Sequence, residues 1–278
     1  MFPFPAYVPR SNQKLITVLT QLGLTGNLKL CLDAGDGDSF TAGDKWLDRS
    51  GGGYDFHRGE DATTDGTEPT FNGTAGALSA NEYFSVASKP DYFRYDSTVE
   101  SWMDNLFHDN ADWAFLCWYW PSSNTPTTTN VIFDTTGDVS GSNGVFSDFT
   151  GASGNRLRLL VQKTGATPLS VTADDVSLPL DQWHFVGARI SEAGGAGASF
   201  FYRDGGYWQV SAADTFNGAY TAPGVGASND TMHLLASGDQ AFAAANGTRI
   251  AMLAMFEGGG LTKANFDAIY DATNRSFR

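Results

Sequence analysis

Hydrophobic and polar residues alternate over many short stretches of this chain, and a period of two is that of a β-strand. In residues 28–33 (LKLCLD) every second residue is leucine, which predicts a strand with one buried face. Residues 112–120 (DWAFLCWYW) are apolar in both alternating sets, which predicts a central strand that is covered on both sides or borders a binding groove. One face of this strand is expected to carry Trp113, Phe115, Cys117 and Tyr119, and the other Leu116, Trp118 and Trp120.

Further strands are predicted along the rest of the chain, joined by polar turns. The pair Asp204–Gly205 suits a tight reversal with positive φ, so residues 199–210 are expected to form a hairpin. The other segments with strand patterns are residues 131–138, 156–162, 178–190 and 249–257. With 32 glycines, only 17% charged residues and a length of 278 residues, the chain has the composition of one large all-β domain with a short extension.

A short helix is predicted near each end of the chain. Ser11 is the candidate cap of the first helix and Gly23 its end. Its apolar stripe consists of Leu15, Val18, Leu19 and Leu22. For the terminal helix, Thr262 is the expected cap, and Leu261 and Phe266 stand at the positions of a hydrophobic staple.

Several segments resemble, in this order, those of the laminin G and concanavalin A-like jelly-roll family, which occurs in phage virion and bacterial surface proteins. The segments are an aspartate-rich loop after the first strand in residues 27–48, residues 50–56 (SGGGYDF), 71–86, 110–121 and 178–190, and the final strand and helix. The resemblance implies an all-β, two-sheet antiparallel jelly-roll sandwich over residues 28–278. Residues 1–27 then form a separate arm and short helix. It also implies a domain that binds glycans or proteins and seldom catalyses a reaction.

The N-terminal arm has the features of an attachment segment. Its prolines disfavour a helix and remove hydrogen-bond donors from a strand. It is therefore expected to bind other virion proteins or copies of itself, with packing onto its own sandwich as the alternative. The candidate partner-binding residues are Phe2, Phe4, Tyr7 and Val8. The same segment lacks an early positive charge and makes a poor secretory signal, which favours a particle assembled in the host cytoplasm. Unconventional export, or a leader missing from this sequence, is the alternative.

Aromatic residues are the candidate glycan contacts, because they combine apolar area with polar handles. Trp120 and Trp208 are the main candidates, and Tyr207 and Trp118 complete the expected platform. Trp113 and Trp183 are instead expected in the core, and a core position is also the alternative for Trp118.

Closely spaced aspartates are a candidate calcium site. Asp33, Asp36 and Asp38 lie near glycines that permit tight turns, and calcium takes about 6–8 oxygen ligands. The alternative is that these carboxylates cap backbone amides in a long loop. No cofactor is expected to be required.

The sequence does not predict an enzyme. Jelly-roll glycosidases need two carboxylates at a set separation, and the related enzymes carry two glutamates four residues apart on one strand. No two of the six glutamates here are that close, and the four histidines are scattered without a catalytic motif. His184 is expected to be a structural histidine with its hydrogen bonds satisfied.

The charge and the apolar segments of the chain exclude two classes of partner, and the two cysteines are expected to be structural. The net charge of −14 argues against nucleic-acid binding and against an electrostatic grip on anionic membranes, and no segment suits insertion into a bilayer. Cys31 and Cys117 are expected to be buried free thiols.

The sequence therefore predicts a non-enzymatic structural or surface protein of a bacteriophage virion that presents a lectin-like jelly roll, with a host surface glycan as candidate ligand. A secreted bacterial carbohydrate-binding adhesin, and thus an extracellular location, is the first alternative. A polysaccharide-degrading enzyme with an unfamiliar pair of acids is the second.

Overall fold

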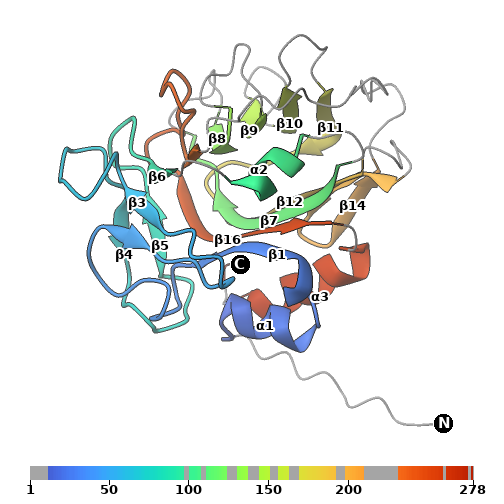
Figure 1. Ribbon diagram of the computed structural model, residues 1–278, viewed down its shortest axis with the longest axis horizontal. Coiled ribbons are helices and arrows are strands. Elements are labelled where there is room, and N and C mark those ends of the chain that lie inside the picture. Colours follow the sequence, from blue (N-terminus) through green and yellow to red (C-terminus); the bar gives the residue numbers. More distant parts are fainter. Residues whose placement is uncertain are drawn as a thin grey trace.

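The computed structural model describes residues 12–96, 100–107, 111–123, 130–136, 144–150, 156–162, 169–191, 198–209, 231–258, 261–274 and 277. Within these residues two antiparallel sheets pack face to face, and helices lie at both ends of the chain (Figure 1). The predicted two-sheet sandwich with an N-terminal and a C-terminal helix is therefore confirmed.

The first sheet contains eight of the described strands, with β7 and β16 at its centre. In spatial order the path is β14 (Gly206–Gln209), β13 (Phe200–Arg203), β12 (His184–Ser191), β7 (Asp112–Trp120), β16 (Arg249–Glu257), β5 (Tyr83–Ser85) and β4 (Thr70–Asn72), and β1 (Leu28–Asp33) also pairs with β16.

The second sheet also contains eight strands in the described part of the chain, and every pairing in it is antiparallel. Its order is β11 (Leu169–Ser177), β10 (Arg156–Gln162), β9 (Gly144–Thr150), β8 (Asn130–Asp134), β15 (Thr231–Leu234), β6 (Phe93–Asp96), β3 (Phe56–Arg58) and β2 (Lys45–Trp46).

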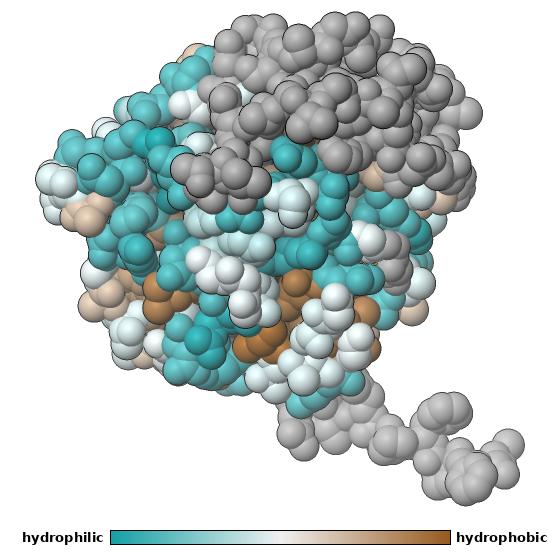
Figure 2. Space-filling model, in the orientation of Figure 1, coloured by the Kyte–Doolittle hydropathy of each residue, from teal (hydrophilic) through white to brown (hydrophobic). Residues whose placement is uncertain are grey.

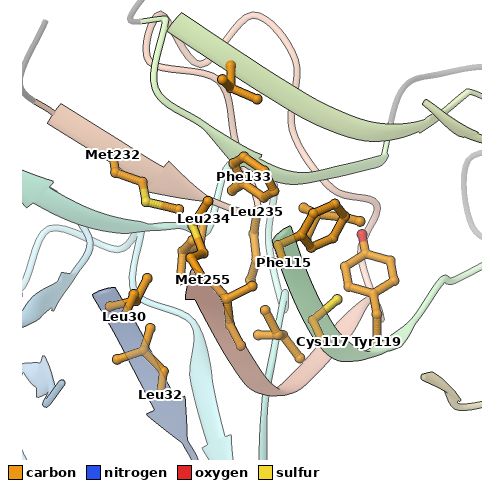
Figure 3. Packing of buried hydrophobic residues seen from close by; sticks show 14 of the residues in the cluster. Leu30, Leu32, Phe115, Cys117, Tyr119, Phe133, Met232, Leu234, Leu235 and Met255 are labelled. Carbon is orange, nitrogen blue, oxygen red and sulfur yellow. The ribbon is translucent and has the colours of Figure 1, made fainter. Parts of the chain in front are cut away.

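The main core lies between the two sheets (Figure 3). Phe115, Cys117 and Tyr119 of β7 point into it, and Phe133 of β8 and Leu234 of β15 face them from the second sheet. The predicted alternation along β7 is confirmed, because Leu116 and Trp118 lie in a separate cluster on the opposite face of the same sheet. Side chains thus cover this strand on both faces, and only its end borders a cleft.

Strand β1 corrects the prediction of one buried face. Both of its faces are covered, because Leu30 and Leu32 lie between the sheets while Leu28 and Cys31 pack among the helices. A β-bulge between Leu28 and Leu30 shifts the register and turns Leu28 to the outer face. The cover on that face comes from helices outside the strand, so the alternation within the strand could not reveal it.

Both cysteines are buried free thiols, as predicted. Cys31 packs in the outer cluster and Cys117 between the sheets, so the two side chains lie on opposite faces of one sheet. Burial raises the pKa of both thiols and keeps them protonated and unreactive.

Helix α1 (Leu15–Gln21) packs onto the sandwich rather than standing apart from it. Leu15, Val18 and Leu19 are fully buried, and they share the outer cluster with residues of α3 (Lys263–Thr273). Figure 1 shows the two helices together on the outer side of the first sheet. This packing agrees with the alternative that the segment packs onto its own sandwich, while the division of the chain at residue 27 stays a prediction. Phe2, Phe4, Tyr7 and Val8 lie outside the described residues.

The first helix begins later than predicted and is capped from a distance. It starts at Leu15, whose N–H group donates to Asp33 Oδ2 at 2.9 Å, while Ser11 lies outside the described residues. Its end is as predicted, because Gly23 has a φ of 69°. The amides of Gly23 and Leu24 donate to Thr20 and Leu19, respectively, which is a Schellman motif.

The terminal helix and the hairpin follow the predictions closely. Thr262 and Asn265 form a reciprocal capping box, and Leu261 and Phe266 are both buried in the outer cluster. The β13–β14 turn at Asp204–Gly205 has φ values of 47° and 89°, as a tight hairpin turn requires.

Two short helical elements were not predicted, because each buries too little for a clear pattern. They are the 3₁₀ helix η1 (Thr25–Asn27) and the helix α2 (Ser101–Asn105), which buries Trp102 and Met103. No described helix has the length and apolar character needed to cross a bilayer. Figure 2 shows a largely hydrophilic surface over the described residues, with a small apolar area beside the helices.

A buried histidine predicts a pH-dependent stability. His233 of β15 is 5% exposed, and burial, helped by the charge of Arg94, lowers its pKa to about 4. Because the unfolded chain takes up the proton near pH ~6.5, the native state loses stability as the pH falls below that value. Between pH ~7 and ~5 this loss amounts to about 2 kcal/mol.

The variant His233→Gln tests this effect by urea unfolding at both pH values. From pH ~7 to ~5, the free energy of unfolding of the wild type should fall by about 2 kcal/mol more than that of the variant. Asp91 and Asp134, whose pKa values burial raises, contribute equally to both proteins and cancel. Equal losses in the two proteins would show that His233 is not the group responsible.

Candidate functional site

An aromatic cleft opens where strand β7 ends and strand β12 begins. The two strands run antiparallel with Tyr119 opposite His184, so the end of one lies beside the start of the other. The cleft has a volume of about 610 Å³. Its lining residues are Trp118, Trp120, Gln182, Trp183, His184, Asp204, Tyr270 and Phe277.

Trp118 forms the floor of this cleft. Its side chain is 1% exposed, and its indole N–H donates to Thr273 Oγ1 at 2.9 Å. The ring stacks on Tyr270 with 5.7 Å between centroids. A tryptophan held in this way supports the cleft and offers almost no surface to a ligand.

Trp120 and Trp183 form the wall at the mouth. Their rings meet edge to face, with 5.8 Å between centroids and 77° between planes, and Phe277 lies 4.9 Å from Trp183. Both tryptophans are only partly buried. The prediction that Trp183 is a core residue is thus wrong, because β12 begins one residue later and Trp183 packs at the edge of the outer cluster.

The polar side of the cleft is held by a fixed set of hydrogen bonds. His184 is 3% exposed, with Nδ1 at 2.6 Å from Asp204 Oδ2 and Nε2 at 2.9 Å from the carbonyl of Pro179. The other carboxylate oxygen of Asp204 accepts the N–H of Phe185 at 2.8 Å. His184 is therefore a satisfied structural histidine, as predicted. Gln182, which is exposed, adds an amide that can both donate and accept.

Arg249 packs behind the aromatic wall. Its guanidinium carbon lies 4.3 Å from the ring centre of Trp120 and 4.8 Å from that of Tyr83. Two rings thus contact this cation, and Tyr83 also meets Trp183, with 5.6 Å between centroids. Sequence reasoning missed Arg249 and Tyr83. The pairing of Arg249 with Trp120 across β16 and β7 brings them together, and no local motif encodes that register.

Tyr207 and Trp208 do not join Trp118 and Trp120, so the predicted four-residue platform is not formed. Neither residue lines the cleft. Trp208 packs against the cluster between the sheets, with Arg203 over its ring. Tyr207, which is 38% exposed, lies next to Phe200. Neighbouring residues of a strand point to opposite faces, so these two cannot share one surface.

The carboxylates of the aspartate loop already form hydrogen bonds and ion pairs within the protein. Asp33 caps α1 and accepts the N–H of Gly35 at 2.9 Å. The ammonium group of Lys14 lies 2.7 Å from Asp36 Oδ1 and 2.6 Å from Asp38 Oδ2. Its hydrogen bond and its charge lower the pKa of Asp38.

Nothing in the described ranges brings three His, Cys, Asp or Glu side chains into a metal-binding group. A calcium ion at Asp36 and Asp38 would have to displace the ammonium of Lys14. Calcium binding by Asp33, Asp36 and Asp38 stays a prediction.

The cleft contains one carboxylate among its lining residues, that of Asp204. Both of its oxygens are engaged, one with His184 and one with the Phe185 amide. Glycoside hydrolysis by the usual route needs a second carboxylate across the scissile bond, and the lining residues supply none.

Comparisons with known proteins establish the fold. No known protein family matches the chain, and no curated protein matches it. Among solved structures, one concerns the cell entry of botulinum neurotoxin type C and its interaction with two ganglioside molecules. It superposes with a TM-score of 0.59 at 13% identity, over 91% of this chain and 53% of that chain.

Two further structures give the same result. The binding domain of botulinum neurotoxin DC in complex with SialylT has a TM-score of 0.58 at 12% identity, over 90% of this chain and 52% of that chain. The binding domain of serotype G has a TM-score of 0.57 at 16% identity, over 88% and 50%. The chain thus has the concanavalin A-like, two-sheet fold of these toxin domains and spans about half of their length.

Proposed function

We propose that this chain is a non-enzymatic, lectin-like domain that binds a glycan in the aromatic cleft. The observation that carries the proposal is the pair Trp120 and Trp183, held edge to face and partly exposed at the mouth. Indole faces are large, apolar and rigid, and they suit the C–H face of a sugar ring. The volume of about 610 Å³ lies in the usual range for a small-molecule site.

The polar part of the cleft supports the same reading. Gln182 offers both donors and an acceptor to sugar hydroxyls. His184 and Asp204 fix the hairpin turn beside it through their mutual hydrogen bond, which keeps the cleft ordered before a ligand arrives. A site with this degree of preorganisation loses little side-chain entropy on binding.

The toxin structures add support of a limited kind. Their descriptions name gangliosides and SialylT as partners of those proteins. This chain corresponds to about half of each, so those binding properties belong to it only as part of this proposal.

The setting that we propose, the surface of a bacteriophage particle, rests on the sequence alone. Residues 1–11, with their apolar side chains and prolines, are the proposed contact to other virion proteins or to copies of the chain. A secreted adhesin is the alternative, and it would use the same cleft. Neighbouring genes for capsid or tail proteins would favour the first setting, and secretion genes the second.

A glycan panel with purified variants tests the binding proposal. Trp120→Ala and Trp183→Ala should each weaken binding of any glycan that the wild type retains by about tenfold, which corresponds to about 1–2 kcal/mol. Their melting temperatures should change by only a few degrees, because both side chains are partly exposed.

Trp208→Ala is the matched control, since it removes a partly buried tryptophan from the opposite face. Loss of binding in this variant alone would move the site to the hairpin, where the sequence also placed a candidate. A wild-type protein that retains no glycan would contradict the proposal. Release of reducing ends from any polysaccharide would contradict its non-enzymatic part.

A further inference from the structure

The guanidinium of Arg249 is an unusual cation in this acidic chain. Trp120 and Tyr83 hold it between their rings, and the residue is only partly buried. Across the described ranges, no acidic side chain lies at salt-bridge distance from it, in contrast to Arg158 and Arg189, which each pair with an aspartate at 2.7 and 2.9 Å.

Arg249 adjoins the wall that the proposed ligand would contact, although it is not itself one of the residues that line the cleft. It lies against Trp120, which lines the cleft. Contacts to ring faces leave the N–H groups at the edge of a guanidinium for hydrogen bonds, and their planar fork matches a carboxylate. A cation held between rings also has few rotamers left to lose when an anion binds.

Two acidic residues near the cleft, Asp204 and Asp181, already have hydrogen-bond partners. Both oxygens of Asp204 are engaged with His184 and the Phe185 amide. Asp181 is exposed and accepts the N–H of Ser123 at 3.1 Å. Hydrogen bonds from Ser123, together with the charge of Arg249, lower the pKa of Asp181. Asp181 is therefore a charged neighbour of Arg249 that would repel an anionic ligand.

We infer that the cleft is selective for a glycan that carries a carboxylate, as a uronic or a sialic acid does, and that Arg249 binds this carboxylate. The inference rests on the proposed function and specifies its ligand. A chain with a net charge of −14 repels anionic sugars in general, so their recognition requires a local, unpaired cation beside the stacking surface. Arg249 is such a cation, because it forms no salt bridge within the described ranges and lies against Trp120.

Matched ligands separate charge recognition from stacking. Oligogalacturonides and their methyl esters differ only in the carboxylate, and sialyllactose and its methyl ester provide a second pair. Wild-type protein should bind the acid of at least one pair about tenfold more tightly than its neutral partner, as a charge-assisted hydrogen bond implies. The pair that shows this preference identifies the source of the carboxylate.

Three variants then assign the effect to Arg249. Arg249→Gln should remove the preference for the acid while the neutral ligand still binds, and Arg249→Lys should keep part of it. Asp181→Asn should increase affinity for the acid, and asparagine tolerates the positive φ of 57° at that position. Arg203→Gln, which removes a cation from the side of Trp208, is the control and should change nothing.

The outcomes distinguish this inference from the proposed function. If wild-type protein binds acid and ester equally, the inference is wrong and the lectin function stands. If Arg249→Gln loses equal affinity for the acid and for the neutral ligand, Arg249 only holds Trp120 in position. That result would also overturn the inference. If no glycan binds, both fail.

Discussion

Removal of residues 1–23 is expected to unfold the domain or to lower its free energy of unfolding by about 6 kcal/mol. The truncation deletes three fully buried side chains, those of Leu15, Val18 and Leu19, and each buried aliphatic side chain contributes about 1.5–3 kcal/mol. It also uncovers part of α3 and β1, and it leaves the buried carboxylate of Asp33 without the Leu15 amide. The total is comparable to the whole stability of a typical domain, about 5–15 kcal/mol.

Two companion proteins sharpen the truncation experiment. Leu19→Ala in the full chain should cost about 2–5 kcal/mol, measured by urea unfolding. A chain that lacks only residues 1–11 keeps α1 and separates the proposed attachment role from the packing role. If the chain that starts at residue 24 unfolds at the same urea concentration as the full chain, α1 is an appendage and its packing has been misjudged.

Replacement of Trp118 by alanine is expected to cost about 3–5 kcal/mol of stability, as for other buried aromatic residues. The change empties the floor of the cleft and removes contacts with Tyr270 and Phe277. It also leaves Thr273 Oγ1 without its indole donor. The sequence left Trp118 either as a ligand contact or as a core residue, and its burial agrees with the second and gives it a supporting role.

The conservative variant Trp118→Phe separates the contribution of apolar packing from that of the indole hydrogen bond. It keeps most of the apolar area and loses the hydrogen bond, so it should cost about 1–2 kcal/mol beyond any packing defect. Chemical denaturation measures both variants. If Trp118→Ala unfolds like the wild type yet fails to bind glycan, the residue is a direct contact and the division into floor and wall is wrong.

The sequence predicts this fold well wherever the determining interactions are local. The alternation along β7, the Asp204–Gly205 turn and the Thr262 cap each depend on a few neighbouring residues, and all three occur as predicted. The two-sheet architecture follows from many such segments in order.

The site is less predictable, because it depends on register between distant strands. Arg249 reaches Trp120 only through the pairing of β16 with β7. Trp183 is only partly buried, and its neighbours Trp120 and Phe277 come from distant segments of the chain. Asp33, a candidate calcium ligand from its spacing, instead caps a helix that precedes it by 18 positions. Composition and spacing contain none of this information.

The most direct test of the glycan-binding cleft is to record the indole N–H resonances of the seven tryptophans during a titration with a glycan selected from the panel. Single Trp→Phe variants assign the resonances. We expect the largest shifts at Trp120 and Trp183, a smaller one at Trp118 beneath them, and none at Trp208. Shifts at Trp208 with an unchanged Trp120 and Trp183, or binding without a shift at either wall residue, would contradict the assignment of the cleft as the binding site.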